Sequence, residues 1–132
     1  MSAQRRSVLV VEDDVDVRGM LLRVLGSSYD VSIADDGDVA LLRFEQGERF
    51  DAVVCDVCMP RMNGPVLVEH LLRLDPDQAG RVIVLTGDAD SAVSARLSSH
   101  FVVEKPFRVR ELRELVARVS AAAHDGELPT LG

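Results

Sequence analysis

Four short apolar runs of the sequence are each followed by side chains that can do chemistry. These side chains are two adjacent acids, Glu12 and Asp13, a third acid, Asp56, the hydroxyl of Thr86 and the amine of Lys105. If the three acids meet, each carboxylate pair about 4–5 Å apart repels by about 3–4 kcal/mol at an effective dielectric of about 20. Such a cluster requires a cation, and carboxylates combined with a backbone carbonyl and water suit Mg²⁺. An aspartate nucleophile, a Mg²⁺ site, a lysine and a hydroxyl are together the components of phosphoryl transfer to a carboxylate.

The apolar runs predict the strands that position these side chains. Residues 8–11, 52–55 and 81–85 are almost continuously apolar, as expected for strands buried on both faces. Apolar and polar residues alternate over 29–33, which indicates a half-exposed strand at an edge of the sheet. Residues 101–103 form the fifth expected strand. Every expected strand except the second therefore ends next to one of the chemical candidates.

Apolar residues at helical spacing follow every expected strand. Asp14 is expected to cap the first of these helices, and Gly26 is expected to end it. Between residues 88 and 99 only Val93 and Leu97 are large and apolar at this spacing. The five expected helices cover residues 14–26, 40–47, 65–75, 88–99 and 109–119.

Alternating strands and helices predict a doubly wound α/β fold with a five-stranded parallel sheet and five helices. An edge position for the second strand gives the order 2-1-3-4-5, which is the flavodoxin-like arrangement. In that order the first and third strands are neighbours at the switch point, where ligands bind beyond the carboxyl ends of the strands. Asp13 follows the first strand and Asp56 ends the third, so we expect both at this point.

The composition indicates one folded domain with an acidic surface. The chain has 132 residues, 47% of them apolar, and its net charge is −7 with a pI near 4.9. This charge argues against nucleic acid as a direct ligand, and no apolar stretch has the length of a membrane span. The cysteine usage and the polar first residues predict a reducing, cytoplasmic location. We expect a domain over residues 1–123 and a flexible tail over 124–132.

Cys55 and Cys58 have the C-x-x-C spacing of redox and zinc sites. A redox pair of this type opens a helix, whereas Cys55 lies inside an expected strand with its side chain in the core. A zinc site requires four ligands, and the histidines that remain, His70, His100 and His124, are scattered along the sequence. We therefore expect no zinc or redox site, and Mg²⁺ is the expected cofactor.

Two of the candidates also have a purely structural interpretation. The acids at 12–14 could serve only to cap a helix, and Lys105 alone could be a solvated surface lysine. Both interpretations lose support when the residues are considered together, because Asp56 ends another strand and Lys105 is followed by Pro-Phe.

Four segments of the chain carry a resemblance to a known family. They are VLVVEDD (8–14), DVCMPRMNG (56–64), LTG (85–87) and EKPF (104–107). In this order, each behind an expected strand, they resemble the receiver domain of two-component response regulators. The resemblance covers about residues 7–120 of the chain.

The resemblance implies a role for each candidate. Asp56 would be the phosphoacceptor, and the peptide before Pro106 is often cis in the family, as X-Pro bonds permit. The Mg²⁺ ion would be held by Asp13 directly, by Glu12 in the same acidic pair through water, by Asp56 and by the backbone carbonyl of Cys58. The phosphoryl group would be bound by Thr86 and Lys105.

The chain departs from the family pattern near its end. The family commonly has an aromatic residue three positions before the lysine, where this chain has Val102, and the aromatic is Phe101. An Ala-Gly pair that is usual before the fifth strand is replaced within residues 98–100. The stretch from Thr86 to Lys105 is also shorter than in many receivers, and this shortened pattern resembles receivers attached to hybrid histidine kinases. By resemblance, Cys58 and Asp88 occupy the positions that tune dephosphorylation.

The resemblance implies a bacterial signalling switch in a phosphorelay and not an enzyme with a separate substrate. A histidine kinase or a phosphotransfer protein would donate the phosphoryl group to Asp56. The modified domain would then contact a downstream protein through its fourth helix, fifth strand and fifth helix. We expect a monomer or weak dimer, with no direct contact to nucleic acid or membrane.

Three other functions compete with this interpretation. A pseudo-receiver interaction module would keep the fold and work without phosphorylation; the altered output face favours it, while the acids, Thr86 and Lys105 count against it. A flavin or nucleotide carrier would need a glycine- or hydroxyl-rich phosphate loop after the first strand, where the acids at 12–14 would repel a phosphate. An aspartyl phosphatase usually carries a second aspartate two positions after its nucleophile, where this chain has Cys58.

Overall fold

Five parallel strands form the centre of the molecule. They are β1 (Ser7–Val11), β2 (Asp30–Ala34), β3 (Ala52–Asp56), β4 (Val82–Thr86) and β5 (Phe101–Glu104). The computed structural model describes residues 5–57, 62, 64–87 and 101–124. The sheet has the order β2-β1-β3-β4-β5, which confirms the predicted doubly wound topology.

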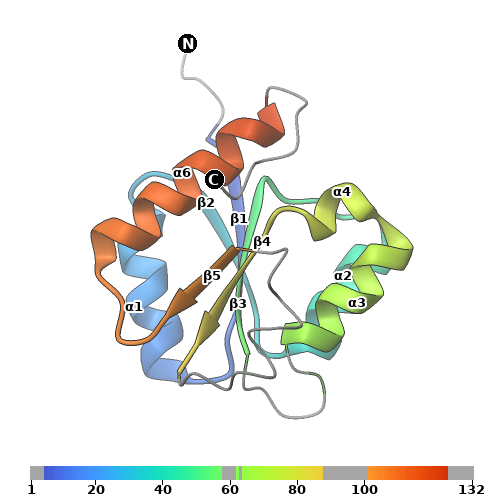
Figure 1. Ribbon diagram of the computed structural model, residues 1–132, viewed down its shortest axis with the longest axis horizontal. Coiled ribbons are helices and arrows are strands. Elements are labelled where there is room, and N and C mark those ends of the chain that lie inside the picture. Colours follow the sequence, from blue (N-terminus) through green and yellow to red (C-terminus); the bar gives the residue numbers. More distant parts are fainter. Residues whose placement is uncertain (1–4, 58–61, 63, 88–100, 125–132) are drawn as a thin grey trace.

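Helices cover both faces of this sheet (Figure 1). They are α1 (Val15–Gly26), α2 (Gly37–Glu45), α3 (Gly64–Leu74), α4 (Pro76–Ala79) and α6 (Val109–His124). In Figure 1, α1 and α6 lie on one face of the sheet, and α2, α3 and the short α4 lie on the other. Within the described ranges, none of the helices combines the length and the apolar composition that crossing a membrane requires.

Alternation along the strands builds two apolar cores, one on each face of the sheet. In β1, Val8 and Val10 pack with residues of α1 and α6, whereas Leu9 and Val11 pack with residues of α2 and α3. All four side chains are fully buried, and burying a side chain of this size contributes about 1.5–3 kcal/mol. Most residues of β2 are only partly buried, which confirms that this strand lies at an edge.

Aspartates cap three of the described helices, α1, α2 and α4. Asp14 Oδ1 accepts a hydrogen bond from the backbone N–H of Val17 at 3.2 Å, which confirms Asp14 as the cap of α1. Asp36 Oδ1 accepts a hydrogen bond from the N–H of Val39 at 3.0 Å, and Asp75 caps α4 in the same way. Because a capped helix can begin soon after a strand ends, the connections on the carboxyl side of β1 and β2 are short.

Some helix boundaries differ from those expected. Helix α2 begins at Gly37, earlier than its apolar pattern indicates, because Asp36 caps it. Asp75, which was expected to end a helix, follows the end of α3 but also starts the extra turn α4. The expected helix over 88–99 lies outside the described residues. With α4 included, the described residues contain five helices, and α6 continues through the first residue of the expected tail.

Helix α2 and the loop after β3 approach each other closely at a glycine. A β-carbon added at Gly37 would lie 2.6 Å from the backbone oxygen of Met62. Met62 itself packs against the core on the α2 and α3 face of the sheet. Only glycine fits at residue 37 while the loop keeps this position.

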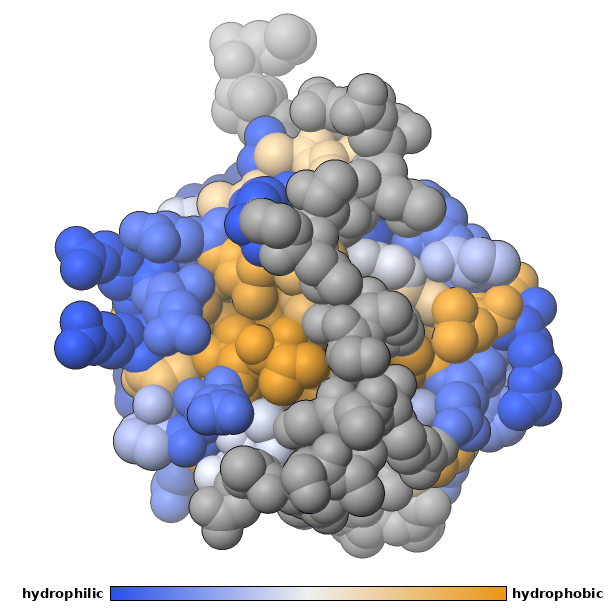
Figure 2. Space-filling view, in the orientation of Figure 1, coloured by the Kyte–Doolittle hydropathy of each residue, from blue (hydrophilic) through white to orange (hydrophobic). Residues whose placement is uncertain are grey.

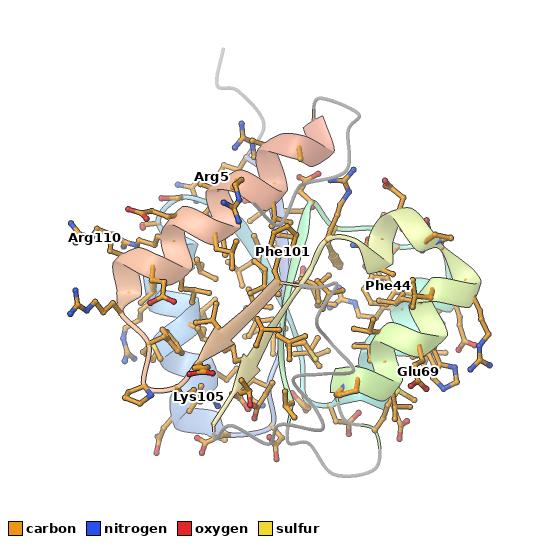
Figure 3. All side chains as sticks on the ribbon, in the orientation of Figure 1. Arg5, Phe44, Glu69, Phe101, Lys105 and Arg110 are labelled. Atoms are coloured by element: carbon orange, nitrogen blue, oxygen red, sulfur yellow. The ribbon has the colours of Figure 1, made fainter. Side chains whose placement is uncertain are left out.

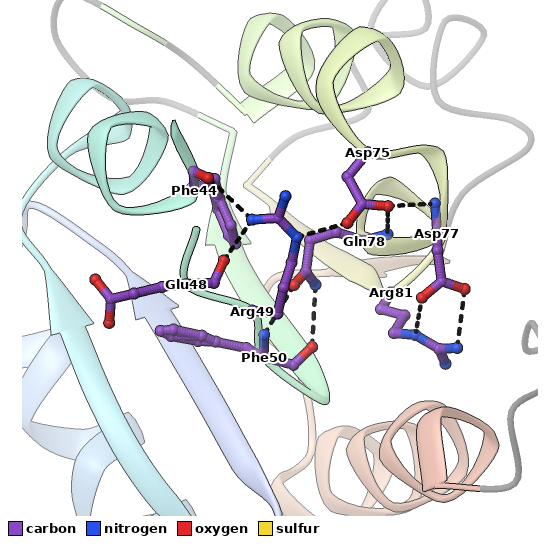
Figure 4. Close-up of polar contacts among 8 residues, drawn as sticks. All are labelled: Phe44, Glu48, Arg49, Phe50, Asp75, Asp77, Gln78 and Arg81. Carbon is purple, nitrogen blue, oxygen red and sulfur yellow. Dashed lines mark hydrogen bonds and ion pairs between the residues drawn. The ribbon is translucent and has the colours of Figure 1, made fainter. Parts of the chain in front are cut away.

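A buried glutamine extends the hydrogen bonding of β3 at its amino end. Gln78, in α4, has a side chain that is 2% exposed. Its Oε1 accepts a hydrogen bond from the backbone N–H of Phe50 at 2.8 Å, and its Nε2 donates to the Phe50 carbonyl at 3.1 Å (Figure 4). The side-chain amide thus satisfies two backbone groups that a neighbouring strand would otherwise satisfy.

Replacing Gln78 tests this pairing. Gln78→Ala is expected to lower the free energy of unfolding by about 2–4 kcal/mol, because both backbone groups of Phe50 lose their partner. Chemical denaturation followed by circular dichroism measures the change. Gln46→Ala, at an exposed glutamine beyond α2, is the matched control and should change the free energy by less than about 0.5 kcal/mol. Equal losses in the two variants would show that the pairing is dispensable.

Candidate functional site

The carboxyl ends of four strands bring the predicted residues to one edge of the sheet. Glu12 and Asp13 follow β1, Asp56 ends β3, Thr86 ends β4, and Lys105 follows β5. These four strands are consecutive neighbours in the sheet. Figure 3 shows Lys105 at this edge. The sheet therefore assembles side chains that are far apart in the sequence, as ligand sites of parallel α/β folds require.

Three carboxylates form a cluster at this edge. One carboxylate oxygen from each of Glu12, Asp13 and Asp56 lies within 4.8 Å of the other two. Glu12 is 1% exposed and Asp56 is 8% exposed, whereas Asp13 is open to solvent. Carboxylates at this separation repel, and burial strengthens the repulsion. The cluster therefore needs positive charge nearby.

Lys105 supplies positive charge to the cluster. Its Nζ lies 3.3 Å from Asp56 Oδ1 and 3.9 Å from Glu12 Oε1. Its backbone N–H donates to the carbonyl of Thr86 at 2.7 Å, so the position of the lysine is tied to β4. The peptide between Lys105 and Pro106 is cis, as the resemblance implies. Within the described ranges, one ammonium group faces three acids, which leaves part of their negative charge uncompensated.

Glu12 is the least favourably placed of the three acids. Burial, followed by the charge of Asp56, raises the pKa of Glu12 to about 7. Its Oε2 accepts a hydrogen bond from the backbone N–H of Asp14 at 3.4 Å, and within the described residues its buried Oε1 accepts none. A buried charged oxygen without a hydrogen bond is costly unless a cation approaches it. This oxygen and its hard carboxylate neighbours fit a divalent cation.

Thr86 is buried at the end of β4, and Gly64 lies close to the backbone of Asp56. Thr86 is 4% exposed at the end of β4. A β-carbon added at Gly64, the first residue of α3, would lie 3.1 Å from the backbone oxygen of Asp56. In the sequence, Gly64 follows Asn63, and an Asn-Gly pair is a general signal of a turn. The same signal occurs at any turn, so the sequence alone does not reveal the close approach of Gly64 to Asp56.

Phe101 and Val102 face opposite sides of the sheet. Phe101 packs in the core with α1 and α6, where the guanidinium carbon of Arg118 lies 5.5 Å from its ring centroid. Val102 is half-buried and packs against the core of the α2 and α3 face. Because side chains alternate along a strand, an aromatic at 101 does not occupy the place that the family gives to an aromatic at 102. The contribution of either residue to switching stays a prediction.

Two expected site residues, Cys58 and Asp88, lie outside the described residues. Of the two cysteines of the C-x-x-C pair, the structure therefore describes only Cys55, which is fully buried in β3. Burial raises the pKa of the Cys55 thiol, so the thiolate that redox and zinc chemistry require is disfavoured.

The sequence profile of the response regulator receiver domain matches residues 8–117. The chain belongs to this family. This receiver domain is 30% identical over 127 residues to the response regulator receiver protein CpdR of Brucella abortus (strain 2308), covering 89% of the chain and 99% of the relative. It is 34% identical over 131 residues to the DNA-binding response regulator MtrA of Mycolicibacterium smegmatis, covering 96% of the chain and 54% of the relative. It likewise spans about half the length of several other curated relatives.

Solved structures agree with this assignment. The signal receiver domain of a signal transduction histidine kinase from Syntrophus aciditrophicus is 28% identical, with a TM-score of 0.80 over 96% of the chain and 98% of that structure. A response regulator receiver protein from Pseudomonas putida is 27% identical, with a TM-score of 0.77 over 88% of the chain and 98% of that structure. The family and the fold that the sequence predicted are confirmed, and the roles of individual site residues stay predictions.

Removing one charge from the cluster tests its repulsion. We expect Asp56→Asn to raise the free energy of unfolding by about 1 kcal/mol in metal-free buffer, because repulsion from Glu12 and Asp13 outweighs the lost attraction of Lys105. Thermal melts in the presence of a chelator should show a midpoint about 2–6 °C higher. Asp30→Asn, at an exposed carboxylate on β2, changes the net charge equally and should stay within about 2 °C of wild type. A lower midpoint for Asp56→Asn would contradict a repulsive cluster.

Proposed function

We propose that this receiver domain is a cytoplasmic phosphorylation switch that accepts a phosphoryl group on Asp56 from a histidine kinase or a phosphotransfer protein. The position of the Asp56 carboxylate carries the proposal. It lies at the carboxyl end of β3, 3.3 Å from the Lys105 ammonium nitrogen, in a cluster with Glu12 and Asp13. A nucleophilic carboxylate beside a fixed cation, in a site that favours further positive charge, suits phosphoryl transfer.

Glu12, Asp13 and Asp56 would hold Mg²⁺ in this proposal. Their mutual distances, the buried Glu12 oxygen that accepts no hydrogen bond within the described residues and the hardness of carboxylate donors all support it. The backbone carbonyl of Cys58, which lies outside the described residues, would complete the set of protein ligands. When bound, Mg²⁺ would neutralise negative charge on the phosphoryl oxygens.

Three side chains, those of Asp56, Lys105 and Thr86, would take part in the phosphoryl transfer. A carboxylate oxygen of Asp56 would form the new P–O bond while the P–N bond of a phosphohistidine breaks, and the imidazole would leave with the electron pair. Lys105, already within 3.3 Å of Asp56 Oδ1, would bind a phosphoryl oxygen as charge moves onto it. The hydroxyl of Thr86 would donate a hydrogen bond to another phosphoryl oxygen. Neither Lys105 nor Thr86 would change its covalent structure.

The output of the switch would pass through protein contacts on β5 and α6. Figure 2 shows apolar side chains gathered over β5, beside α6. Val102 and Leu115 are half-buried in this part of the molecule. The expected fourth helix lies outside the described residues, so the proposal rests on β5 and α6. MtrA is named a DNA-binding protein, whereas the net charge of −7 here favours a protein as the direct partner.

Intact-mass spectrometry after incubation with acetyl phosphate tests the chemistry. Wild type is expected to gain one phosphoryl group in the presence of Mg²⁺ and to gain none when a chelator is present. Asp56→Asn should gain none in either buffer, because its amide is not a nucleophile for this reaction. Asp30→Asn, outside the cluster, should be phosphorylated like wild type.

Two results would contradict this proposal. If wild type gains no mass and beryllofluoride also fails to bind, the domain works without phosphorylation as a pseudo-receiver, and the proposal is wrong. If phosphorylation occurs on Asp56→Asn as readily as on wild type, the acceptor is another residue and the assignment of Asp56 is wrong.

Mg²⁺ should also stabilise the folded protein. Thermal melts are expected to show a higher midpoint for wild type as Mg²⁺ is added, because a ligand that binds only the folded state stabilises it by mass action. The increase should be smaller for Asp56→Asn, which keeps two carboxylates, than for wild type, which has three. An equal rise of the melting midpoint in both proteins would show that Asp56 does not contribute to the metal site.

A further inference from the structure

An arginine of α1 contacts the backbone between two of the clustered acids. Nη1 of Arg18 donates a hydrogen bond to the carbonyl oxygen of Glu12 at 3.2 Å. The same nitrogen lies 3.2 Å from Asp35 Oδ1, in the connection after β2. The Arg18 side chain is 22% exposed, whereas that of Asp35 is 77% exposed. The arginine therefore links α1, the end of β1 and the end of β2.

The carbonyl that Arg18 holds belongs to the peptide that joins Glu12 to Asp13. A peptide unit is planar, so fixing this oxygen also fixes the direction in which the chain continues to Asp13. The N–H of Glu12 is held as well, because it donates to the carbonyl of Ala34 at 3.1 Å. Both backbone polar groups of Glu12 thus have hydrogen-bond partners, so the side chains of Glu12 and Asp13 are attached to a backbone that is held in place.

The contacts that hold the Glu12 carboxylate are longer than those that hold its backbone. Its Oε2 accepts a hydrogen bond from the N–H of Asp14 at 3.4 Å, and its Oε1 lies 3.9 Å from Lys105 Nζ. Repulsion from Asp56 acts to push the Glu12 side chain away from the cluster. A backbone free to rotate would allow the two acids to separate and relieve this repulsion.

We propose that Arg18 is a positioning residue that holds the peptide between Glu12 and Asp13 and so keeps their carboxylates arranged for a divalent cation. This role rests on the proposed function, because it concerns the same metal site. Arg18 contacts neither the cation nor the phosphoryl group in this account; it acts only through the Glu12 carbonyl.

The direction in which Mg²⁺ affinity changes when the Arg18 guanidinium is removed distinguishes a positioning role from simple electrostatics. A positive guanidinium close to a cation site repels the cation, so removing it would strengthen Mg²⁺ binding if charge were all that mattered. Loss of a positioning contact would instead weaken binding. An arginine that serves only the stability of the fold would leave the affinity unchanged.

Arg43 offers a matched control on α2. Its Nη1 donates to the carbonyl of Ile33, in β2, also at 3.2 Å, and it forms an ion pair with Glu48. It therefore makes the same kinds of contact as Arg18, but the carbonyl it holds does not belong to a residue of the acidic cluster.

Calorimetric titration with Mg²⁺ alone tests the proposal on wild type, Arg18→Met, Arg18→Lys and Arg43→Met. Arg18→Met, which keeps the apolar stem, should weaken Mg²⁺ binding about 3- to 10-fold, the loss expected for one hydrogen bond. Arg18→Lys, which keeps one donor, should fall between wild type and Arg18→Met, and Arg43→Met should stay within about twofold of wild type. Metal-free thermal melts establish whether each variant is folded. If Arg18→Met is unfolded, the Mg²⁺ affinity of Arg18→Lys compared with wild type tests the proposal.

A kinetic measurement adds a second readout. At saturating Mg²⁺, phosphorylation of Arg18→Met by acetyl phosphate should proceed within about twofold of the wild-type rate, because only the affinity for the cation depends on the arginine. The positioning role would be overturned if Arg18→Met bound Mg²⁺ as tightly as wild type or more tightly. It would also be overturned if Arg18→Lys bound Mg²⁺ no more tightly than Arg18→Met, or if Arg43→Met lost as much affinity as Arg18→Met. If wild type itself binds no Mg²⁺, the proposed function fails, and the role of Arg18 fails with it.

Discussion

Confinement of like charges at the ends of parallel strands is the constraint on which the site depends. The sheet carries the carboxylates of Glu12 and Asp56 into a buried position that neither would adopt alone, with Lys105 Nζ 3.9 Å and 3.3 Å away. The two apolar cores and the strand ladders offset this local cost. An unfavourable arrangement held by a favourable scaffold is typical of functional sites, and it leaves the site responsive to any added charge.

The surroundings of Lys105 determine which part of the site can respond. Its backbone N–H is bonded to the Thr86 carbonyl at 2.7 Å, whereas its side chain is 28% exposed and has several rotatable bonds. A change of charge at Asp56 therefore acts first on the ammonium group. Lys105 directly follows β5, in which Val102 contacts one core and Phe101 the other.

Periodic features of the fold could be predicted from the sequence, and pairwise contacts could not. Uninterrupted apolar runs identify buried strands, and parallel strands share one carboxyl edge, so the meeting of Asp56 with Lys105 followed from the order of the strands. The buried pairing of Gln78 with Phe50 joins residues that are far apart in the sequence and has no periodic signature. The contact of Arg18 with the Glu12 carbonyl was missed because a charged residue on a helix is usually solvated. The structure was needed to show that Phe101 and Val102 pack in different cores.

The close approach of Gly37 to Met62 has a consequence for how this domain tolerates substitution. A β-carbon at residue 37 would lie 2.6 Å from the backbone oxygen of Met62, so the start of α2 and the loop after β3 cannot change independently. A larger residue at 37 becomes acceptable only after the loop has shifted, and a shifted loop alters the connection that leads from Asp56 into α3. Sequence drift in α2, outside the acidic cluster, is thereby restricted by the geometry of the segment that follows Asp56.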